Sequence, residues 1–397
     1  MTAAKLTGDP VKFPFARPHP TQMPPEFAGA RAAERLCRVE TVTGEPAWLA
    51  SRYEDVRFVL NDPRFSARVP AGPMGAGAVA DNSLFQDPPG HTRLRRLVNR
   101  TFTSGRIEKL RPYTEKTVSA LVDAMLAEGP PLDFMTAFAT QVPARVITEL
   151  LGVPDGARQA FRDAAADFVL LEKGQGKEEI YAKGGRVAEL ITQTIAAKRE
   201  HPEDDLMTEL ISVQAEEDGR LTEAELVTMG LTLLIAGYMT TADAISMGTL
   251  FLLEHGLLGE LSGKPDVVES AVEEILRYDP KVSCPSRVAK EDLDLNGTPV
   301  KAGEIVLASQ QSANRDERQF DDAARFDIHR EQNRHIAFGF GIHYCLGAQL
   351  ARMELRVAFA ALADRLVELR LSHPVTDLEW RTNLFGEQRI GNLGVTW

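Results

Sequence analysis

The cysteine Cys345 stands in a glycine-rich stretch that could bind a metal through sulfur. The stretch runs from His335 to Gly347 and reads HIAFGFGIHYCLG. Glycines let a backbone turn tightly and press close to a flat group. The apolar run Ala348–Leu362 predicts a helix directly after it, so a thiolate at Cys345 would gain from the helix dipole and from amide donors. Such a sulfur is a good axial ligand for haem iron and favours O–O cleavage. The alternative is a buried cysteine in an ordinary turn.

The spacing around Cys345 favours the haem interpretation. Phe338, Gly341, Cys345 and Gly347 form the pattern F-x-x-G-x-x-x-C-x-G, which resembles the haem-binding loop of the cytochrome P-450 family. The resemblance implies haem b (iron protoporphyrin IX) as the cofactor, with Cys345 as its iron ligand. It also implies a mainly α, triangular cytochrome P-450 fold with a small β region, in which the haem lies between a long central helix and the helix after the cysteine. His343, two residues before Cys345, could be a second metal ligand, but this spacing in a loop favours a contact with a haem propionate.

Composition limits the class of protein. The chain has 397 residues, of which 44% are hydrophobic and 26% charged, as is typical of a globular protein. Its net charge of −12 argues against nonspecific binding to nucleic acid or to an anionic membrane. The three cysteines Cys37, Cys284 and Cys345 are far apart, which argues against a disulfide framework or a zinc site.

The number of domains and the cellular location of the protein are predicted from features that the sequence lacks. The length exceeds that of a usual single core, but we find no linker or internal repeat. We therefore expect one domain over residues 1–397, with the Pro-rich segment 1–46 belonging to it. Residues 1–20 contain no apolar leader, and the apolar run Leu226–Leu253 carries Asp243, as a buried helix does more readily than a membrane span. A cytoplasmic protein is expected.

A basic helix is predicted after Asp87. His91 and Arg95 are four residues apart and therefore share one face. A basic helix face is usually exposed to solvent without binding a ligand, but the resemblance implies that this pair holds a haem propionate. The planar guanidinium of Arg95 matches the shape of a carboxylate. It assigns the second propionate-binding arginine to Arg287. With no flavin or iron–sulfur motif in the chain, the resemblance implies a ferredoxin and its reductase as electron donors. The arginines of a docking patch for an acidic ferredoxin would be Arg93, Arg96 and Arg100.

The capping box formed by Thr222 and Glu225 predicts a long helix that ends near His255. It contains the run AGYMTT, residues 236–241. Gly237 by itself would indicate a close helix crossing, and a threonine hydroxyl can compete for a backbone carbonyl. The resemblance instead implies an oxygen-binding groove of Ala236, Gly237 and Thr240, in which Thr240 helps to protonate bound dioxygen. Met239 stands where the family usually has an acid, and methionine has no exchangeable proton. Asp243 follows one turn later, but the sequence does not place it in the pocket.

Glu274 and Arg277 form an i,i+3 ion pair on a helix predicted from Pro265. Such pairs usually contribute little at a surface. The resemblance assigns them to a structural motif that supports the cysteine loop, with Arg325 as the third member.

The remaining elements are predicted from periodicity and turn residues. Trp48–Leu60 is expected to be a strand passing into a helix, Asn296-Gly297 a hairpin turn and Ile305–Ala308 a strand. The segment 172–176 is a plausible lid hinge. The further helices and the terminal hairpin are expected at Thr114–Leu126, Pro143–Leu151, Gly156–Leu171, Lys177–Lys198 and Thr382–Trp397.

The expected substrate pocket combines the Gly/Pro-rich loop Val69–Ser83, which could equally be a plain surface loop, with five side chains: Leu233, Met239, Val282, Ser283 and Phe385. The resemblance implies monooxygenation of a small, largely apolar secondary metabolite with O2. The alternative reaction is oxidative radical C–C or C–N coupling of aromatic substrates such as indole cyclodipeptides or phenolic polyketides. The missing acid at Met239 motivates this alternative. A third hypothesis is a haem-binding sensor without enzymatic activity.

Overall fold

The computed structural model describes residues 11–19, 21–41, 44–68, 84–169, 176–215, 221–282, 284–382 and 388–397. The chain forms two compact units. The first unit comprises residues 1–72, 269–345 and 375–377, and the second comprises residues 73–268, 346–374 and 378–397. Because each unit is assembled from segments that are far apart in the sequence, no linker marks a boundary between them.

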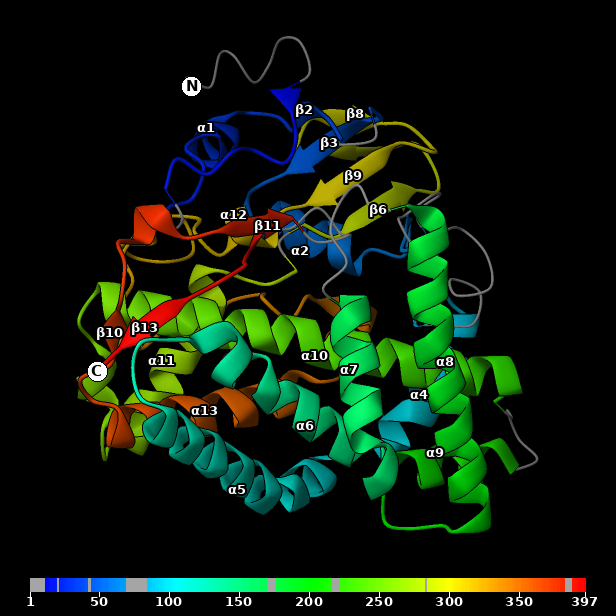
Figure 1. Cartoon of the computed structure of the whole chain (residues 1–397). Helices are drawn as coiled ribbons and strands as arrows, with labels where there is room; N and C mark the ends of the chain where they lie inside the picture. The colour runs from blue at the N-terminus through cyan, green and yellow to red at the C-terminus, as the bar shows by residue number, and fades with distance from the viewer. Residues whose placement is uncertain are drawn as a thin grey trace. The chain divides into compact units, whose positions relative to one another are not determined.

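A six-stranded sheet organises the first unit, and its middle strands lie side by side in Figure 1. The strand order is β1 (Val11–Lys12), β2 (Cys37–Glu40), β3 (Pro46–Ala50), β9 (Ile305–Ala308), β6 (Ser286–Ala289), β4 (Phe65–Ser66). The central pair β3 and β9 is parallel, with Ala47 opposite Ile305. β7 (Leu293–Leu295) and β8 (Thr298–Val300) form a hairpin whose turn is Asn296-Gly297, both at positive φ. The predicted turn and the strand Ile305–Ala308 are therefore confirmed.

The helices of the first unit are short. α2 (Tyr53–Asn61) buries Tyr53, Val56, Val59 and Leu60 along one face, as its apolar spacing requires. It follows β3, so the predicted passage from strand to helix is confirmed. The other helical segments are α1 (Glu26–Ala32), most of α11 (Pro265–Tyr278), α12 (Gln310–Ala313) and the 3-10 turns η5 (Gly341–His343) and η6 (Val375–Asp377).

The second unit is mainly helical, and α10 (Glu223–Glu254) runs through it (Figure 1). Both hydrogen bonds of the capping box are present. The Thr222 hydroxyl accepts from the Glu225 N–H at 3.1 Å, and the Glu225 carboxylate accepts from the Thr222 N–H at 2.8 Å. The predicted helix is confirmed, with His255 as its C-cap. Within the described ranges, α10 alone is long and apolar enough to cross a membrane, but half of its most apolar window is buried, as in a core helix.

The other helices of the second unit pack around α10, with α6 and α13 directly against it. They are α4 (Gly90–Thr101), α5 (Ser104–Glu128), η2 (Met135–Ala139), α6 (Gln141–Leu150), η3 (Asp155–Ala157), α7 (Arg158–Val169), α8 (Lys177–Glu200), α9 (Leu206–Ala215), η4 (Leu258–Leu261) and α13 (Ala348–Arg365). The predicted helices agree with α6, α7 and α8 to within a few residues. The helix predicted from Thr114 instead begins ten residues earlier, at Ser104, and runs through Pro112. Its buried face continues across the proline, from Ile107 and Leu110 to Val118.

Two small sheets complete the second unit. The strands β10 (Arg370–Leu371), β13 (Gly394–Thr396) and β5 (Leu132–Asp133) form one, and β11 (Trp380–Thr382) with β12 (Gln388–Ile390) form a hairpin. The prediction of a single terminal hairpin over Thr382–Trp397 is therefore partly wrong. The last strand joins the other sheet because Val395 is fully buried opposite Leu132.

Candidate functional site

The loop that carries Cys345 is closed by backbone hydrogen bonds; we call residues His335–Cys345 the Cys loop. The Cys345 N–H donates to the Phe338 carbonyl at 2.8 Å, and the Gly339 N–H donates to the Ile336 carbonyl at 2.9 Å. Gly341 has a φ of +73°, and a Cβ there would lie 2.8 Å from Asn61 Oδ1 at the end of α2. Only glycine fits this position, because the left-handed backbone and the close contact both exclude a side chain.

Cys345 is exposed, as are two apolar side chains beside it in the loop. Ile342 is 51% and Tyr344 40% exposed. Clustered exposed apolar groups commonly mark a binding surface. A flat, apolar ring with a metal ion at its centre would cover these side chains and place the metal at the sulfur, so this part of the chain fits a haem. Gly347, the N-cap of α13, adds no obstacle, since a Cβ there would meet nothing within 4 Å.

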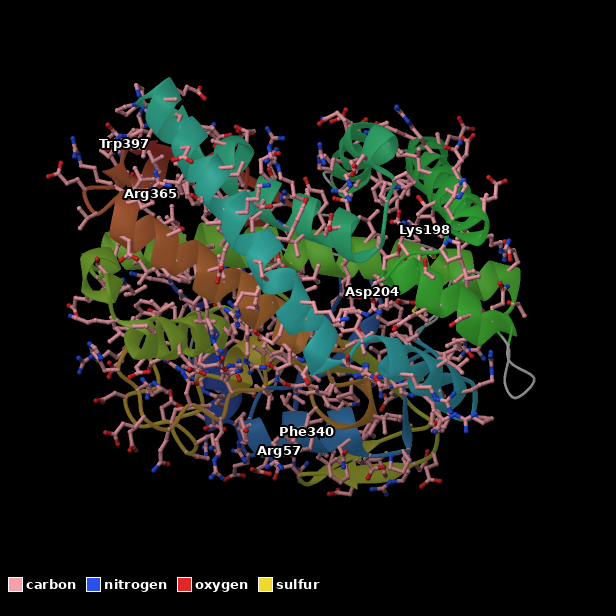
Figure 2. All side chains as sticks on the ribbon, turned by 90° about the horizontal axis from the view of Figure 1, so that it is seen from below. Arg57, Lys198, Asp204, Phe340, Arg365 and Trp397 are labelled. Atoms are coloured by element: carbon pink, nitrogen blue, oxygen red, sulfur yellow. The ribbon has the colours of Figure 1, made fainter. Side chains whose placement is uncertain are left out.

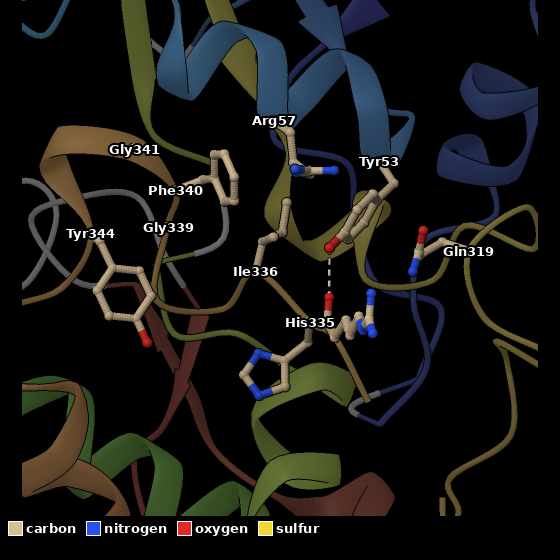
Figure 3. A pocket seen from close by; sticks show the side chains of 10 residues that line it. Tyr53, Arg57, Gln319, His335, Ile336, Gly339, Phe340, Gly341 and Tyr344 are labelled. Carbon is tan, nitrogen blue, oxygen red and sulfur yellow. Dashed lines mark hydrogen bonds between the residues drawn. The ribbon is translucent and has the colours of Figure 1, made fainter. Parts of the chain in front are cut away.

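The Cys loop, with Tyr344 among its residues, also lines a hollow of about 530 Å³ together with α2 (Figure 3). The Arg57 guanidinium lies over the Phe340 ring at 4.4 Å, and the two residues are also neighbours in the view of the whole chain (Figure 2). The Tyr53 hydroxyl donates to the Arg334 carbonyl at 2.6 Å. The His335 ring accepts from the Ala337 N–H at 3.2 Å. These contacts fix the conformation of the loop from the side of α2.

A buried charge cluster supports the loop from α11. Glu274 and Arg277 are both fully buried, and two guanidinium N–H groups of Arg277 donate to the carboxylate at 2.7 and 2.8 Å. Arg330 adds a third bond to this carboxylate at 3.2 Å, and Asn333 a fourth at 3.1 Å. The prediction that the Arg325 side chain is the third member of this cluster is wrong. Arg325 contributes only its backbone carbonyl, which accepts a hydrogen bond from Arg277 at 2.9 Å. The Glu274 carboxylate is bound by the side chains of Arg330 and Asn333, which follow Arg325 in the chain, and not by the side chain of Arg325.

The remaining predicted residues of the first unit lie on β6 or just before it. Arg287 is buried, and its guanidinium donates to the Ser286 carbonyl at 2.9 Å. Val282 is 46% exposed. Ser283 lies outside the described residues, as do Phe385, the loop Val69–Ser83 and most of the segment 172–176.

In the second unit, α4 places His91 and Arg95 one turn apart. His91 is buried, and Arg95 is half-buried. Burial, and secondly the charge of Arg95, lower the pKa of His91, which therefore stays neutral at pH 7. A neutral imidazole donates one hydrogen bond and accepts another, so His91 could donate to a carboxylate while Arg95 supplies the charge.

The three arginines predicted to form a docking patch on α4 do not share one environment. Arg93 forms an ion pair with Glu225, the buried N3 residue of the α10 capping box. Its charge is neutralised there, so its place in the patch is not supported. Arg96 and Arg100, one turn apart, are exposed.

The middle of α10 divides the predicted groove residues between two faces. Ala236 is exposed, and the hydroxyl of half-buried Thr240 donates to its carbonyl at 2.6 Å. Gly237 faces α6 instead, because a Cβ there would lie 3.1 Å from Ile147 Cδ1. The close helix crossing that the glycine indicated is therefore present. Leu233 and Met239 are buried in the core cluster that contains Ile147.

Two residues that are prominent in the structure, Glu354 and Arg389, were not predicted from the sequence. Glu354 on α13 is 2% exposed, and among the described residues no partner lies within hydrogen-bond distance of its Oε2. Burial raises the pKa of this carboxyl well above 4.5. Glu354 lies on the apolar stripe of Leu350 and Met353, a signal that could have found it. Arg389 of β12 pairs with Asp243 of α10, and no local pattern links two positions so far apart.

Comparisons with known proteins agree on one family. Residues 265–373 match the family model of cytochrome P-450. The chain is 40% identical to the nocardicin C N-oxygenase of Nocardia uniformis subsp. tsuyamanensis over 398 residues, which cover 98% of this chain and 99% of that one. The chain belongs to the cytochrome P-450 family. As a cytochrome P-450 it is an oxidoreductase of the monooxygenase type that uses haem iron.

Two further relatives of this cytochrome P-450 define its class. The mycinamicin IV hydroxylase/epoxidase of Micromonospora griseorubida is 39% identical over 389 residues, covering 94% of this chain and 96% of that one. The crystal structure of the LnmA cytochrome P-450 hydroxylase from the leinamycin biosynthetic pathway of Streptomyces atroolivaceus has a TM-score of 0.87 and 38% identity, covering 98% of this chain and all of that one. The predicted family and the mainly α fold with a small β region are confirmed.

Proposed function

We propose that this cytochrome P-450 binds haem b and inserts one oxygen atom from O2 into a small, largely apolar secondary metabolite. The observation that carries the proposal is the exposed Cys345 thiol in a loop whose shape is fixed by glycines, α2 and the Glu274 cluster. When bound, haem iron supplies the activation of O2, and thiolate ligation favours O–O cleavage. The residues proposed to hold the haem are Cys345 as iron ligand, Phe338 and Gly347 beside it, His91, Arg95, Arg287 and His343 at the propionates, and Ala236 on α10; the predicted contact at Gly237 is not proposed again, because this glycine faces α6.

Thr240 is the proposed catalytic residue of α10. Its hydroxyl donates to the Ala236 carbonyl, so Oγ1 is held at the exposed face of the helix and keeps a lone pair to accept a further hydrogen bond. Oγ1 can therefore hold a proton-donating water or pass on a proton there. Met239, one residue earlier, is packed in the core cluster and offers no proton.

Thr240→Ala should lower the amount of product formed per electron pair consumed, because the group that directs the proton is lost. Thr240→Ser keeps the hydroxyl and should retain most of the product yield. The measurement is the ratio of product to reduced nicotinamide consumed. A ratio in Thr240→Ala equal to that of Thr240→Ser and of the wild type would show that the Thr240 hydroxyl has no part in the mechanism.

Electrons are proposed to come from a ferredoxin and its reductase. Arg96 and Arg100 are the exposed charges of α4 that an acidic ferredoxin could meet, and complementary charge mainly speeds encounter. The double charge reversal Arg96→Glu/Arg100→Glu should slow reduction about tenfold or more at low salt, with a smaller effect at high salt. Arg35→Glu, at an exposed position of the first unit, is the control. Equal reduction rates in both variants would contradict this docking site.

The reaction is tested with ¹⁸O2 and a library of small secondary metabolites. The relatives named as an N-oxygenase and a hydroxylase/epoxidase support oxygen insertion. The proposal expects a product that carries one ¹⁸O atom. A product without the label, joined between two aromatic rings, would contradict it and favour radical coupling. We place the enzyme in the cytoplasm, where reduced nicotinamide and ferredoxin are available.

A further inference from the structure

Three residues of α10 form a stripe along one face of the helix. Ala236, Thr240 and Asp243 occupy positions i, i+4 and i+7, which is the spacing of a single helical face. Ala236 is exposed and Thr240 half-buried. Asp243 retains 12% side-chain exposure. A carboxylate therefore lies at the end of the face that presents the Thr240 hydroxyl.

The counterion of Asp243 comes from the β11–β12 hairpin. Arg389 Nε lies 3.9 Å from Asp243 Oδ1, and the Arg389 side chain is only 6% exposed. Burial raises the pKa of Tyr238, and the charge of Arg389 offsets part of this rise, so the guanidinium also lies near a second residue of α10. The neighbouring Ile390 is 1% exposed. β12 contacts α10, and the pair of Arg389 with Asp243 is the charged part of that contact.

The hairpin needs such an anchor. It has only two strands, and an isolated two-stranded hairpin is marginally stable in water. Arg381 and Arg389 are direct cross-strand partners, and like charges in that position are destabilising. Arg381 is paired with Glu379 at 3.1 Å at the surface, whereas Arg389 is buried against α10. The carboxylate of Asp243 therefore compensates a charge that the hairpin carries into the interior.

We propose that the Asp243–Arg389 ion pair docks the β11–β12 hairpin on the reactive face of α10 and thereby determines which ligands fit beside Thr240. Asp243 is in this role a positioning residue, and its effect passes through the place of β12. The significance of the Thr240 face rests on the proposed function, whereas the docking of the hairpin does not.

The docking is measured by amide hydrogen exchange in the haem-loaded protein. Asp243→Asn should raise exchange in Gln388–Ile390 about tenfold or more, because the hairpin opens locally. Exchange in β13, which belongs to the other sheet of the same unit, should not change. Arg389→Gln should have the same effect as Asp243→Asn, and the double variant should add little to either, as for two partners of one interaction. Unchanged exchange in β12, or an equal rise in β13, would overturn the proposal.

A charge swap separates positioning from a direct role of the carboxylate. Asp243→Arg/Arg389→Asp keeps an ion pair between the same positions, so exchange in β12 should return toward the wild-type value. The fit of ligands is read by spectral titration with imidazole and with the bulkier 4-phenylimidazole. Asp243→Asn should change the ratio of the two dissociation constants about fivefold or more, a change on the scale of 1 kcal/mol, and the swap should restore it. A ratio that stays constant in Asp243→Asn, or that the swap leaves altered, would contradict the assigned role.

Discussion

Glu354 is a carboxyl group enclosed in the second unit by α13 and its neighbours. Its Oε2 has no hydrogen-bond partner among the described residues, and burial raises the pKa of the group well above 4.5. A buried carboxylate without a partner would be very unfavourable, so Glu354 keeps its proton in the folded state. The folded protein therefore holds a proton that the unfolded chain releases above about pH 4.5.

Glu354→Gln should make the free energy of unfolding less dependent on pH. The contribution of Glu354 to the free energy of unfolding of the wild type falls as pH rises above 4.5 toward the folded-state pKa. Glutamine does not ionise, so the difference in free energy of unfolding between the variant and the wild type should grow with pH by up to about 1.4 kcal/mol per unit. Urea unfolding between pH 5 and pH 8 measures it, with exposed Glu368→Gln as control. A difference that stays constant over this range would mean that Glu354 is ionised when folded.

The sequence could predict single residues where their partners are close in the chain. The Cys345 spacing and the pair of His91 and Arg95 are local patterns. Asp243 could not be placed from sequence, because its partner Arg389 belongs to a distant strand. Sequence alone also could not show that Arg93 forms an ion pair with Glu225, since that contact joins two separate helices.

At the scale of elements, α11 is tied to the segment before the Cys loop. Arg277 donates to the carbonyls of Asn314 and Ala323, both at 2.8 Å, as well as to that of Arg325. The Asp327 N–H donates to the Glu274 carboxylate at 2.8 Å. The cluster thus replaces regular secondary structure in a segment of turns, and it holds that segment in the conformation that leads to Cys345.

Arg330→Ala should destabilise the protein by about 1.5–3 kcal/mol, because it removes a buried hydrogen bond to the charged Glu274 carboxylate. Arg325→Ala is the matched control, since only the backbone carbonyl of Arg325 enters the cluster. Its effect should be within about 0.5 kcal/mol, as for most surface substitutions. Thermal unfolding of both variants measures the difference. A loss of stability in Arg325→Ala well above this value would show that the Arg325 side chain is the third member of the Glu274 cluster.

Elements could be predicted where a local signal begins or ends them. The capping box located the start of α10, and Asn296-Gly297 located the β7–β8 turn. The start of α5 could not be predicted, because Pro112 is a helix-breaking signal that the buried face of the helix overrides. The partner of the last strand could not be predicted either, since it depends on β5, which lies far away in the sequence.

At the scale of the whole molecule, the order of the chain hides its organisation. Each compact unit is assembled from segments that alternate along the sequence with segments of the other unit. Cys345 and Arg287 belong to the first unit, and His91, Arg95 and Thr240 to the second. Composition and motifs therefore predicted the family and the fold class, whereas the division into units required the structure.

Cys345 is proposed to bind haem iron as a thiolate. The most direct test is the absorption spectrum of the purified, reduced protein under carbon monoxide, with Cys345→Ser measured alongside. A strongly red-shifted Soret band in the wild type that is lost in Cys345→Ser is expected, because thiolate pushes electron density onto the iron. A carbonyl band typical of histidine ligation, or the absence of haem from the wild-type protein, would show that Cys345 is not the iron ligand.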